Sequence, residues 1–238
     1  MDFDLSVDQK EIKRVARELL AARSPWAKVR EAAERRRYDE SLWQELVALG
    51  WPGIGVAERH GGQGLGAVEL AVLAEQLGYA CAATAALAST TAAAVIAATG
   101  TPEQQERWLP GLCRGELRGA IGTRELAADA AGADVVVLLH GDDAHLVAAP
   151  DTTPFEAIDP TRRYALVDTQ VQGDPLGAGA AARVRTAVAA EVLGICQRAL
   201  EMTIEYVKDR KQFGVPVGSF QAVGHRCAQM LLTTESIR

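Results

Sequence analysis

The chain has 238 residues, of which 48% are hydrophobic, and its formal net charge is −6. An acidic chain lacks the basic face that neutralises nucleic-acid phosphates, and aromatic residues, at 5%, are too few for base-stacking platforms. The composition therefore indicates a globular protein of one large domain or two to three small ones, and excludes general nucleic-acid binding.

The cysteines and the apolar segments favour a cytoplasmic protein without a membrane span. Cys81, Cys113, Cys196 and Cys227 are far apart, so they predict neither a zinc site nor a disulfide framework. The opening string MDFDLSVDQK is acidic and has no apolar signal region. The Ala- and Thr-rich run at 80–100 lacks the bulky residues of a membrane span and predicts a buried helix.

The first half of the chain predicts helices. Ser6 and Gln9 have the spacing of a capping box, and Thr101 followed by Pro102 and Gln104 marks another helix start. Glycine residues end two of the helical patterns. The predicted helices share a 3.6-residue apolar period and cover residues 6–19, 41–49, 68–78, 82–99 and 102–113.

Short β-branched runs replace the helical period after Gly119. Residues 133–140 and 144–150 predict a hairpin around a GDD turn, and residues 163–171 predict a third strand. Residues 173–179 predict a linker, after which helical patterns cover residues 180–209 and the stretch from Ser219 to the last residue. That last pattern is still periodic at Arg238, so we expect the sequence to end within an element.

Two motifs that could bind a cofactor or metal are better explained structurally. The string GGQGLGA has a formal G-x-G-x-x-A match at Gly62, Gly64 and Ala67. A dinucleotide site needs a preceding strand, whereas a helical segment precedes this string, so a loop between helices is favoured. The histidines share no ligand spacing on one helix face, so no metal site is predicted.

Glu191 and Arg210 are the charged residues with the most informative positions. Glu191 falls within the apolar stripe of the helix predicted at 180–209, where a carboxylate is paired, at a subunit interface, or in a site that raises its pKa. The stripe consists of Val184, Val188, Ile195, Ala199 and Met202. Arg210 ends this helix, and Ser219 is expected to cap the next. The pair predicts either an anion site or ordinary charge–dipole pairing at a helix end.

Five strings give the sequence its most specific pattern. They are LGWPGIGVAERHGGQGLGAVELAVLAEQLG, GTPEQQERWLPGLCRGE, DPTRRYALV, DPLGAG and AAEVLGICQRALEMTIEYVKDRKQFGVPVGSFQAVGHRCAQM. Together they resemble the acyl-CoA dehydrogenase family over nearly the whole chain. The wording of DPTRRYA is most similar to divergent actinobacterial members that act on bulky or steroid-derived acyl-CoAs, often as heteromers.

The resemblance implies a mainly α fold in three parts. They are an N-terminal all-α domain (1–117), a short β domain (118–173) and a partial C-terminal helical domain (174–238). It also implies FAD-dependent α,β-dehydrogenation of an acyl-CoA, in which a glutamate removes the α-proton and the flavin takes the β-hydrogen as hydride. The implied partners are the acyl-CoA substrate, electron-transfer flavoprotein as acceptor, and a homologous subunit in a homo- or hetero-oligomer.

Five residues acquire expected roles from the resemblance. Arg210, Gln212, Phe213 and Gln221 match positions that contact FAD in the family, with Arg210 facing its pyrophosphate. Arg185 matches an arginine that lies near bound acyl-CoA.

Three departures from the family pattern bear on activity. The T-E-P-x-x-G-S-D string that should follow GAIGT is replaced by RELAADAAGADVVV, so the first strands of the β domain are expected to be missing. One glutamate base position of the family is Val184 here, and the other lies beyond Arg238. The chain could therefore be a catalytic subunit, a non-catalytic partner subunit of a heteromeric acyl-CoA dehydrogenase, or an inactive fragment.

Overall fold

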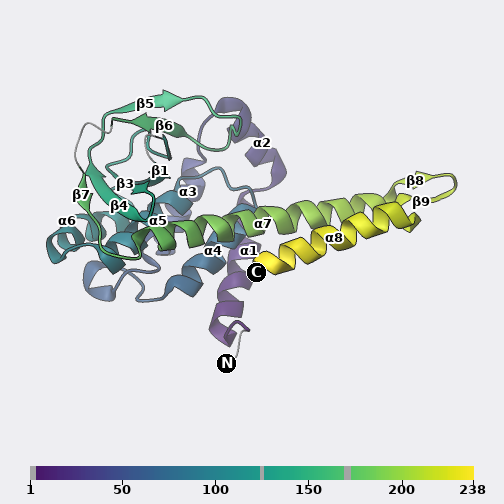
Figure 1. The fold of residues 1–238 in the computed structure, drawn as a ribbon, viewed down its shortest axis with the longest axis horizontal. Helices are drawn as coiled ribbons and strands as arrows, with labels where there is room; N and C mark the ends of the chain where they lie inside the picture. The colour runs from purple at the N-terminus through teal and green to yellow at the C-terminus, as the bar shows by residue number, and fades with distance from the viewer. Residues whose placement is uncertain (1–3, 124–125, 169–172) are drawn as a thin grey trace.

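The structure is a computed structural model that describes residues 4–123, 126–168 and 173–238. Figure 1 shows a group of N-terminal helices, a sheet that lies against them, and two long C-terminal helices that project past both as a hairpin. This architecture confirms the predicted mainly α fold with a helical part, a small β part and a second helical part.

Local capping interactions set the ends of several N-terminal helices. Ser6 and Gln9 form the predicted capping box, and Thr101 and Gln104 form a second one. The helices are α1 (Val7–Arg23), α2 (Trp26–Arg35), α3 (Glu40–Ala48), α4 (Ala67–Tyr79), α5 (Ala86–Thr99) and α6 (Pro102–Cys113). Two short 3-10 turns, η1 (Trp51–Gly53) and η2 (Glu58–His60), lie between α3 and α4.

Two N-terminal segments differ from the sequence prediction. Helix α2 lies outside the predicted helices; its sequence is mostly polar, and Val29 is its one buried residue. Residues 82–85 were expected to be helical but precede α5 as non-helical chain. There the Ala83 carbonyl accepts a hydrogen bond of 3.0 Å from the amide of Asp39, the N-cap of α3, which holds this segment out of the helix.

The sheet has seven strands in the order β5-β6-β2-β1-β3-β4-β7. The strands are β1 (Gly119–Thr123), β2 (Leu126–Ala128), β3 (Val135–His140), β4 (Asp143–Ala148), β5 (Thr152–Phe155), β6 (Tyr164–Val167) and β7 (Asp174–Pro175). The predicted hairpin is confirmed as β3–β4, in which His140 pairs with Asp143. The third predicted strand is β6, although residues 169–172 of that prediction lie outside the described residues.

Two strands that the sequence pattern did not predict, β1 and β2, precede the predicted hairpin. Strand β1 lies at the centre of the sheet, parallel to β3 and antiparallel to β2. Its residues include Gly119, Ala120 and Gly122, which have low β-propensity and hide the strand from a pattern search. A Cβ at Gly122 would lie 2.5 Å from the Cα of Ala127, so the small residue is what allows β1 and β2 to pair closely.

Both faces of strand β3 are buried. Alternate residues of β3 point to opposite faces of the sheet, and Val135, Val137 and Leu139 pack into a core shared with α5, α6 and α7 (Ala180–Asp209). On the other face, Val136 and Leu138 pack with residues from neighbouring strands. The continuous apolar run in this strand therefore reflects burial from two sides.

The C-terminal hairpin confirms one prediction and corrects another. Helix α7 has the predicted bounds and is followed by β8 (Lys211–Gln212), β9 (Val215–Pro216), η3 (Val217–Ser219) and α8 (Gln221–Ile237). The predicted cap at Ser219 is wrong, because the N-cap residue of α8 is Phe220. The Ser219 hydroxyl instead donates a hydrogen bond of 2.6 Å to the Pro216 carbonyl inside the preceding turn.

The predicted apolar stripe of α7 does not face the core. Val184 is buried, but Val188, Ile195 and Met202 are between 38% and 44% exposed. The face that packs carries Ala187 and Gly194 instead. Small residues occupy it because α4 crosses α7 at backbone contact: a Cβ on Gly194 would overlap the Glu75 carbonyl oxygen and lie 2.7 Å from the Tyr79 nitrogen.

A buried tyrosine–aspartate pair joins the helices to the sheet. The Tyr38 hydroxyl donates a hydrogen bond to the carboxylate of Asp129, and the Arg163 amide donates one of 3.0 Å to the Tyr38 oxygen. The Asp129 amide donates to the Arg163 carbonyl at 2.7 Å. Burial raises the pKa of Asp129, and the nearby Arg162 charge only partly opposes this.

We expect Asp129→Asn to gain stability relative to the wild type as the pH rises from about 4. An acid whose pKa is raised on folding contributes stability below its unfolded pKa and loses it as the pH rises through the folded pKa. The loss is about 1.4 kcal/mol for each unit by which the pKa is raised, and the neutral amide avoids it while still accepting the Tyr38 hydrogen bond. Urea unfolding at pH 4 and pH 7 measures the difference. A stability gap that is constant with pH, or that shrinks as the pH rises, would contradict the assignment.

Candidate functional site

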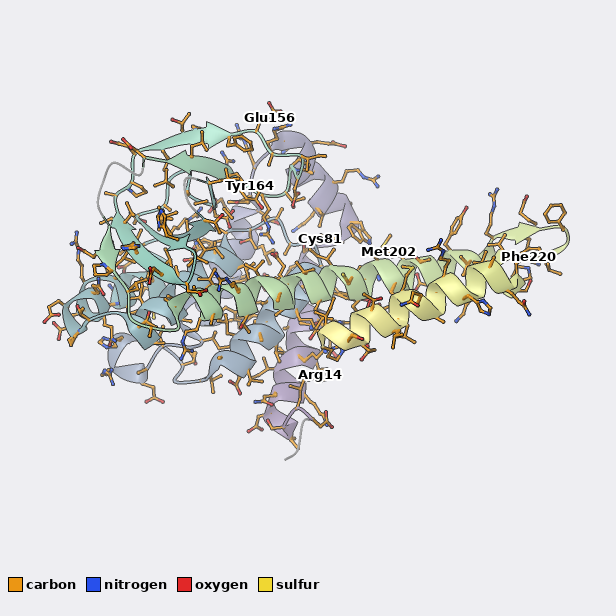
Figure 2. The ribbon with its side chains drawn as sticks, in the orientation of Figure 1. Arg14, Cys81, Glu156, Tyr164, Met202 and Phe220 are labelled. Carbon is orange, nitrogen blue, oxygen red and sulfur yellow. The ribbon has the colours of Figure 1, made fainter. Side chains whose placement is uncertain are left out.

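The residues matched to the flavin site gather at the far end of the C-terminal hairpin. Arg210 is the C-cap of α7, Gln212 and Phe213 follow in the β8–β9 turn, and Gln221 opens α8. The Val217 amide donates a hydrogen bond of 2.7 Å to the Arg210 carbonyl, which closes the turn. Figure 1 shows this turn as the most distant point from the sheet, and Figure 2 shows Phe220 beside it.

We call this end of the hairpin, residues 210–221, the tip. It exposes an aromatic ring and hydrogen-bond donors to solvent. Phe213 is 94% exposed and has a φ of 54°, so with Gly214 (φ 83°) it forms a two-residue turn of the left-handed kind. A bulky residue in this conformation costs stability, which points to a use for the exposed ring. Its ring lies 6.2 Å from that of Phe220 in an edge-on arrangement.

The electrostatics of the tip fit a phosphate group. Arg210 forms no ion pair within the described ranges, and Lys208 and Lys211 flank it in sequence. Because Phe220 has no side-chain acceptor, the first amides of α8 have no side-chain cap. An exposed guanidinium beside an uncapped helix N-terminus is a donor set suited to a pyrophosphate.

Arg185, the residue matched to the acyl-CoA site, lies at the other end of α7. Its guanidinium donates a hydrogen bond of 2.7 Å to the carboxylate of Asp142 and another to the Gly141 carbonyl, in the turn between β3 and β4. Arg185 and Arg210 are 25 residues apart in one helix, which separates them by about 37 Å. A single chain therefore does not bring the two groups of predicted site residues together.

Glu191 is a largely buried carboxylate of α7, and the structure confirms that it is paired. Its carboxylate accepts from the guanidinium of Arg162, and both side chains are about 11–12% exposed. Arg162 also donates a hydrogen bond of 3.0 Å to the Thr84 carbonyl before α5. Arg162 lies in the loop before β6. The only sequence signal for its role was a pair of arginines next to a predicted strand.

The family base position that falls within this chain, Val184, offers no carboxylate. Val184 is 5% exposed and lies in the core cluster formed with the strand residues Val137 and Leu146. A side chain in this place packs between helix and sheet. Neither Val184 nor Glu191 is therefore positioned to remove a substrate proton.

The glycine-rich loop does not form a phosphate cradle. Its consecutive amides from Gly62 to Leu65 all donate to nearby backbone carbonyls, among them that of Val56, which accepts from Gly64 at 2.8 Å. A Cβ on Gly62 would lie 2.6 Å from the Val56 side chain, so the glycine is required for close packing. The structure agrees with the predicted loop between helices.

Metal-ligand clusters, cysteine pairing and membrane-length helices can be searched for in the part of the chain that is described. No group of three or more potential ligand side chains gathers there to hold a metal ion, and all four cysteines are free thiols. None of the described helices combines the length and apolar character that a membrane crossing requires.

Comparisons with known proteins extend this picture. The family model for the acyl-CoA dehydrogenase N-terminal domain matches residues 6–116, and the model for the C-terminal domain matches residues 175–238. Acyl-CoA dehydrogenase IpdE2 of Mycobacterium tuberculosis is 32% identical over 236 residues, which cover 97% of this chain and 73% of that protein. IpdE2 of Mycolicibacterium smegmatis is 33% identical over 238 residues, covering 96% and 75%.

Solved structures show the same relationship. The Tcur3481-Tcur3483 steroid ACAD G363A variant superposes with a TM-score of 0.83 and 28% identity, over 96% of this chain and 74% of that one. A chain of the ChsE4-ChsE5 complex from Mycobacterium tuberculosis gives a TM-score of 0.78 and 25% identity, over 100% and 79%.

Proposed function

The chain belongs to the acyl-CoA dehydrogenase family, and from this premise we propose that it takes part in FAD-dependent α,β-dehydrogenation of an acyl-CoA as one subunit of an oligomer. The observation that carries the proposal is the distance of about 37 Å along α7 between Arg185 and Arg210. Since one chain holds these residues far apart, its tip serves a flavin whose remaining contacts come from a homologous subunit.

Each residue of the tip has a distinct role in this proposal. Arg210 pairs with the pyrophosphate, Gln212 and Gln221 donate hydrogen bonds, and Phe213 packs its exposed ring against the cofactor. FAD, when bound, supplies the hydride acceptor for the substrate β-carbon. Arg185 attracts the acyl-CoA at the opposite end of α7. The Arg185 side chain is held there by Asp142 in the β3–β4 turn.

The finer assignments rest on the relatives. One relative is a mycobacterial acyl-CoA dehydrogenase, and one similar structure is described as a steroid ACAD. We therefore propose an acyl-CoA from fatty-acid or steroid catabolism as the substrate. Electron-transfer flavoprotein is the proposed electron acceptor, and a cytoplasmic location accords with four free cysteines. We propose domain boundaries at 1–117, 118–173 and 174–238: the first lies just before β1, and the second lies just before β7, the last strand of the sheet, which leads into α7.

A second function is supported by the same coordinates: a non-catalytic partner subunit of a heteromeric acyl-CoA dehydrogenase. Val184 is buried, and Glu191 is held by Arg162, so neither supplies a base. The C-terminal hairpin also exposes apolar surface of the kind that subunit contacts cover. Its exposed large apolar side chains are Val188, Val192, Ile195, Met202, Tyr206, Met230, Leu231, Leu232 and Ile237.

We expect Arg210→Met to lower flavin occupancy about tenfold or more in a complex with a homologous chain, because a charge-assisted phosphate contact contributes about 1.5–3 kcal/mol. The chain is purified alone and after co-expression with that homologue, and the visible absorption spectrum gives the flavin-to-protein ratio. Arg226→Met, which removes an exposed α8 arginine, is the matched control.

The outcomes separate the two functions. If acyl-CoA bleaches the bound flavin in the complex but not in the isolated chain, the two chains share the function. If replacing the catalytic base of the homologue then abolishes bleaching, the present chain is the non-catalytic partner. Stoichiometric flavin on the isolated chain, unchanged by Arg210→Met, would exclude the proposed tip site.

A further inference from the structure

A cavity of about 350 Å³ lies where α1, α4 and α7 meet the start of α2. Its walls are mostly apolar and include Leu20, Trp26 and Tyr79. The volume falls within the range of small-molecule sites. The cavity is distinct from the flavin tip, because its α7 residue, Arg198, precedes Arg210 by twelve residues, or about 18 Å of helix.

Two arginines in this cavity make no direct ion pair with a carboxylate among the described residues, although the charge of Glu201 acts on both and its pKa is lowered in part by them. Arg17 and Arg198 both line it, and neither forms an ion pair within the described ranges. Their guanidinium carbons lie 3.6 Å and 5.3 Å from the ring centroid of Tyr79, which holds them in place. The neighbouring carboxylate of Glu201 is engaged by the Tyr79 hydroxyl and by Gln197.

One residue of the cavity wall carries a buried amide. Gln76 lines the cavity and is 1% exposed, and its Oε1 accepts a hydrogen bond of 2.8 Å from Arg17 Nε. This bond fixes the orientation of the amide, since the flipped group would set two donors against each other. The Nε2 group then has no hydrogen-bond partner among the residues that the structure describes. A buried unpaired donor costs about 1–3 kcal/mol, which a ligand acceptor would recover.

We propose that this cavity binds a small organic carboxylate with an apolar or aromatic body. Its walls carry two guanidinium groups and one amide, a donor set that a carboxylate satisfies, and the hydroxyl groups of Ser24 and Tyr79 belong to the same walls. Its apolar walls accommodate a ring, and Trp26, whose indole is 5.6 Å from the Arg198 guanidinium, borders the opening at 43% exposure. The cavity is separate from the flavin tip, and Arg198 also lies thirteen residues, or about 20 Å of helix, from Arg185. A ligand here would therefore regulate or stabilise the chain without taking part in the reaction.

The test uses benzoate as the probe and benzamide as its neutral isostere. We expect saturable one-to-one binding of benzoate by calorimetry, accompanied by a change in tryptophan fluorescence, because the other three tryptophans are buried. Benzamide is expected to bind at least about tenfold more weakly, since it offers no charge to the arginines. Equal affinity for the two ligands, or no saturable binding of benzoate, would overturn the proposal.

A variant pair places the site on the molecule. Arg198→Met is expected to weaken benzoate binding about tenfold or more, and Arg30→Met, an equal charge change at an exposed position of α2, is expected to leave it unchanged. An equal loss in both variants would overturn the assignment. Thermal melts show whether each variant is folded. If Arg198→Met does not fold, the comparison of benzoate with benzamide on the wild type decides whether the cavity binds a carboxylate.

Discussion

Gly194→Ala is expected to destabilise the chain by about 3 kcal/mol or more, the upper end of the cost of overpacking a core. A Cβ on Gly194 would overlap the Glu75 carbonyl oxygen and lie 2.7 Å from the backbone nitrogen of Tyr79. Both atoms belong to the backbone of α4, so no side chain can rotate away to make room. The two helices would have to separate, and the apolar contacts on either side of the crossing would loosen.

A second glycine in the hairpin provides the control. Gly224 lies in α8, where the nearest atom to an added Cβ is 3.6 Å away and the backbone has an ordinary helical conformation. Gly224→Ala should therefore be neutral or stabilise by up to about 1 kcal/mol, because alanine is the better helix former. Urea unfolding of both variants measures the difference, and similar free energies of unfolding for the two would refute the close crossing.

The crossing of α4 and α7 also determines where the candidate flavin residues lie. Helix α7 is fixed to α4 near Gly194, and the rest of the helix extends beyond the N-terminal part of the molecule (Figure 1). The remaining four turns of α7 carry Arg210 and Phe213 away from the sheet. Figure 2 shows Met202 along this projecting part, where its side chain is 44% exposed. The reach of the tip thus follows from a contact between two backbones.

Local signals predicted the fold best where the cause was itself local. The capping boxes at Ser6 and Thr101 and the bounds of α7 follow from a few adjacent side chains and were predicted correctly. The prediction for the buried face of α7 is wrong, because it rests on the positions of large apolar residues. The close packing of α4 and α7 instead requires small residues, Ala187 and Gly194, on the buried face. Strand β1 was missed for the same reason, since close pairing requires the small residue Gly122.

The candidate site was predictable as a set of residues but not as an arrangement. The match to the family identified Arg210 and Arg185, and these roles stay predictions. The helix predicted at 180–209 already separates the two residues by its length, and the structure confirms its bounds, which makes a second subunit part of the proposal. The pairing of Glu191 with Arg162 was likewise beyond the sequence, because 29 residues and a change of element separate the two.

Arg162→Met is expected to destabilise the chain by about 3–5 kcal/mol, the usual cost of removing one partner from a buried ion pair. The substitution leaves the Glu191 carboxylate, about 12% exposed, without its counter-charge, and the Thr84 carbonyl loses a hydrogen bond of 3.0 Å. It also removes the positive charge that lowers the pKa of Asp129, so a second buried carboxylate becomes more costly to ionise. Chemical denaturation at neutral pH measures the loss.

The exposed pair formed by Arg36 and Glu156 gives the matched control, because both side chains are more than half exposed. Arg36→Met should cost no more than about 1 kcal/mol. Removing both buried partners, in Arg162→Met with Glu191→Leu, should cost less than Arg162→Met alone, since no uncompensated charge remains. Additive losses in the double variant, or equal losses for Arg162→Met and Arg36→Met, would show that the ion pair does not hold the sheet, α5 and α7 together.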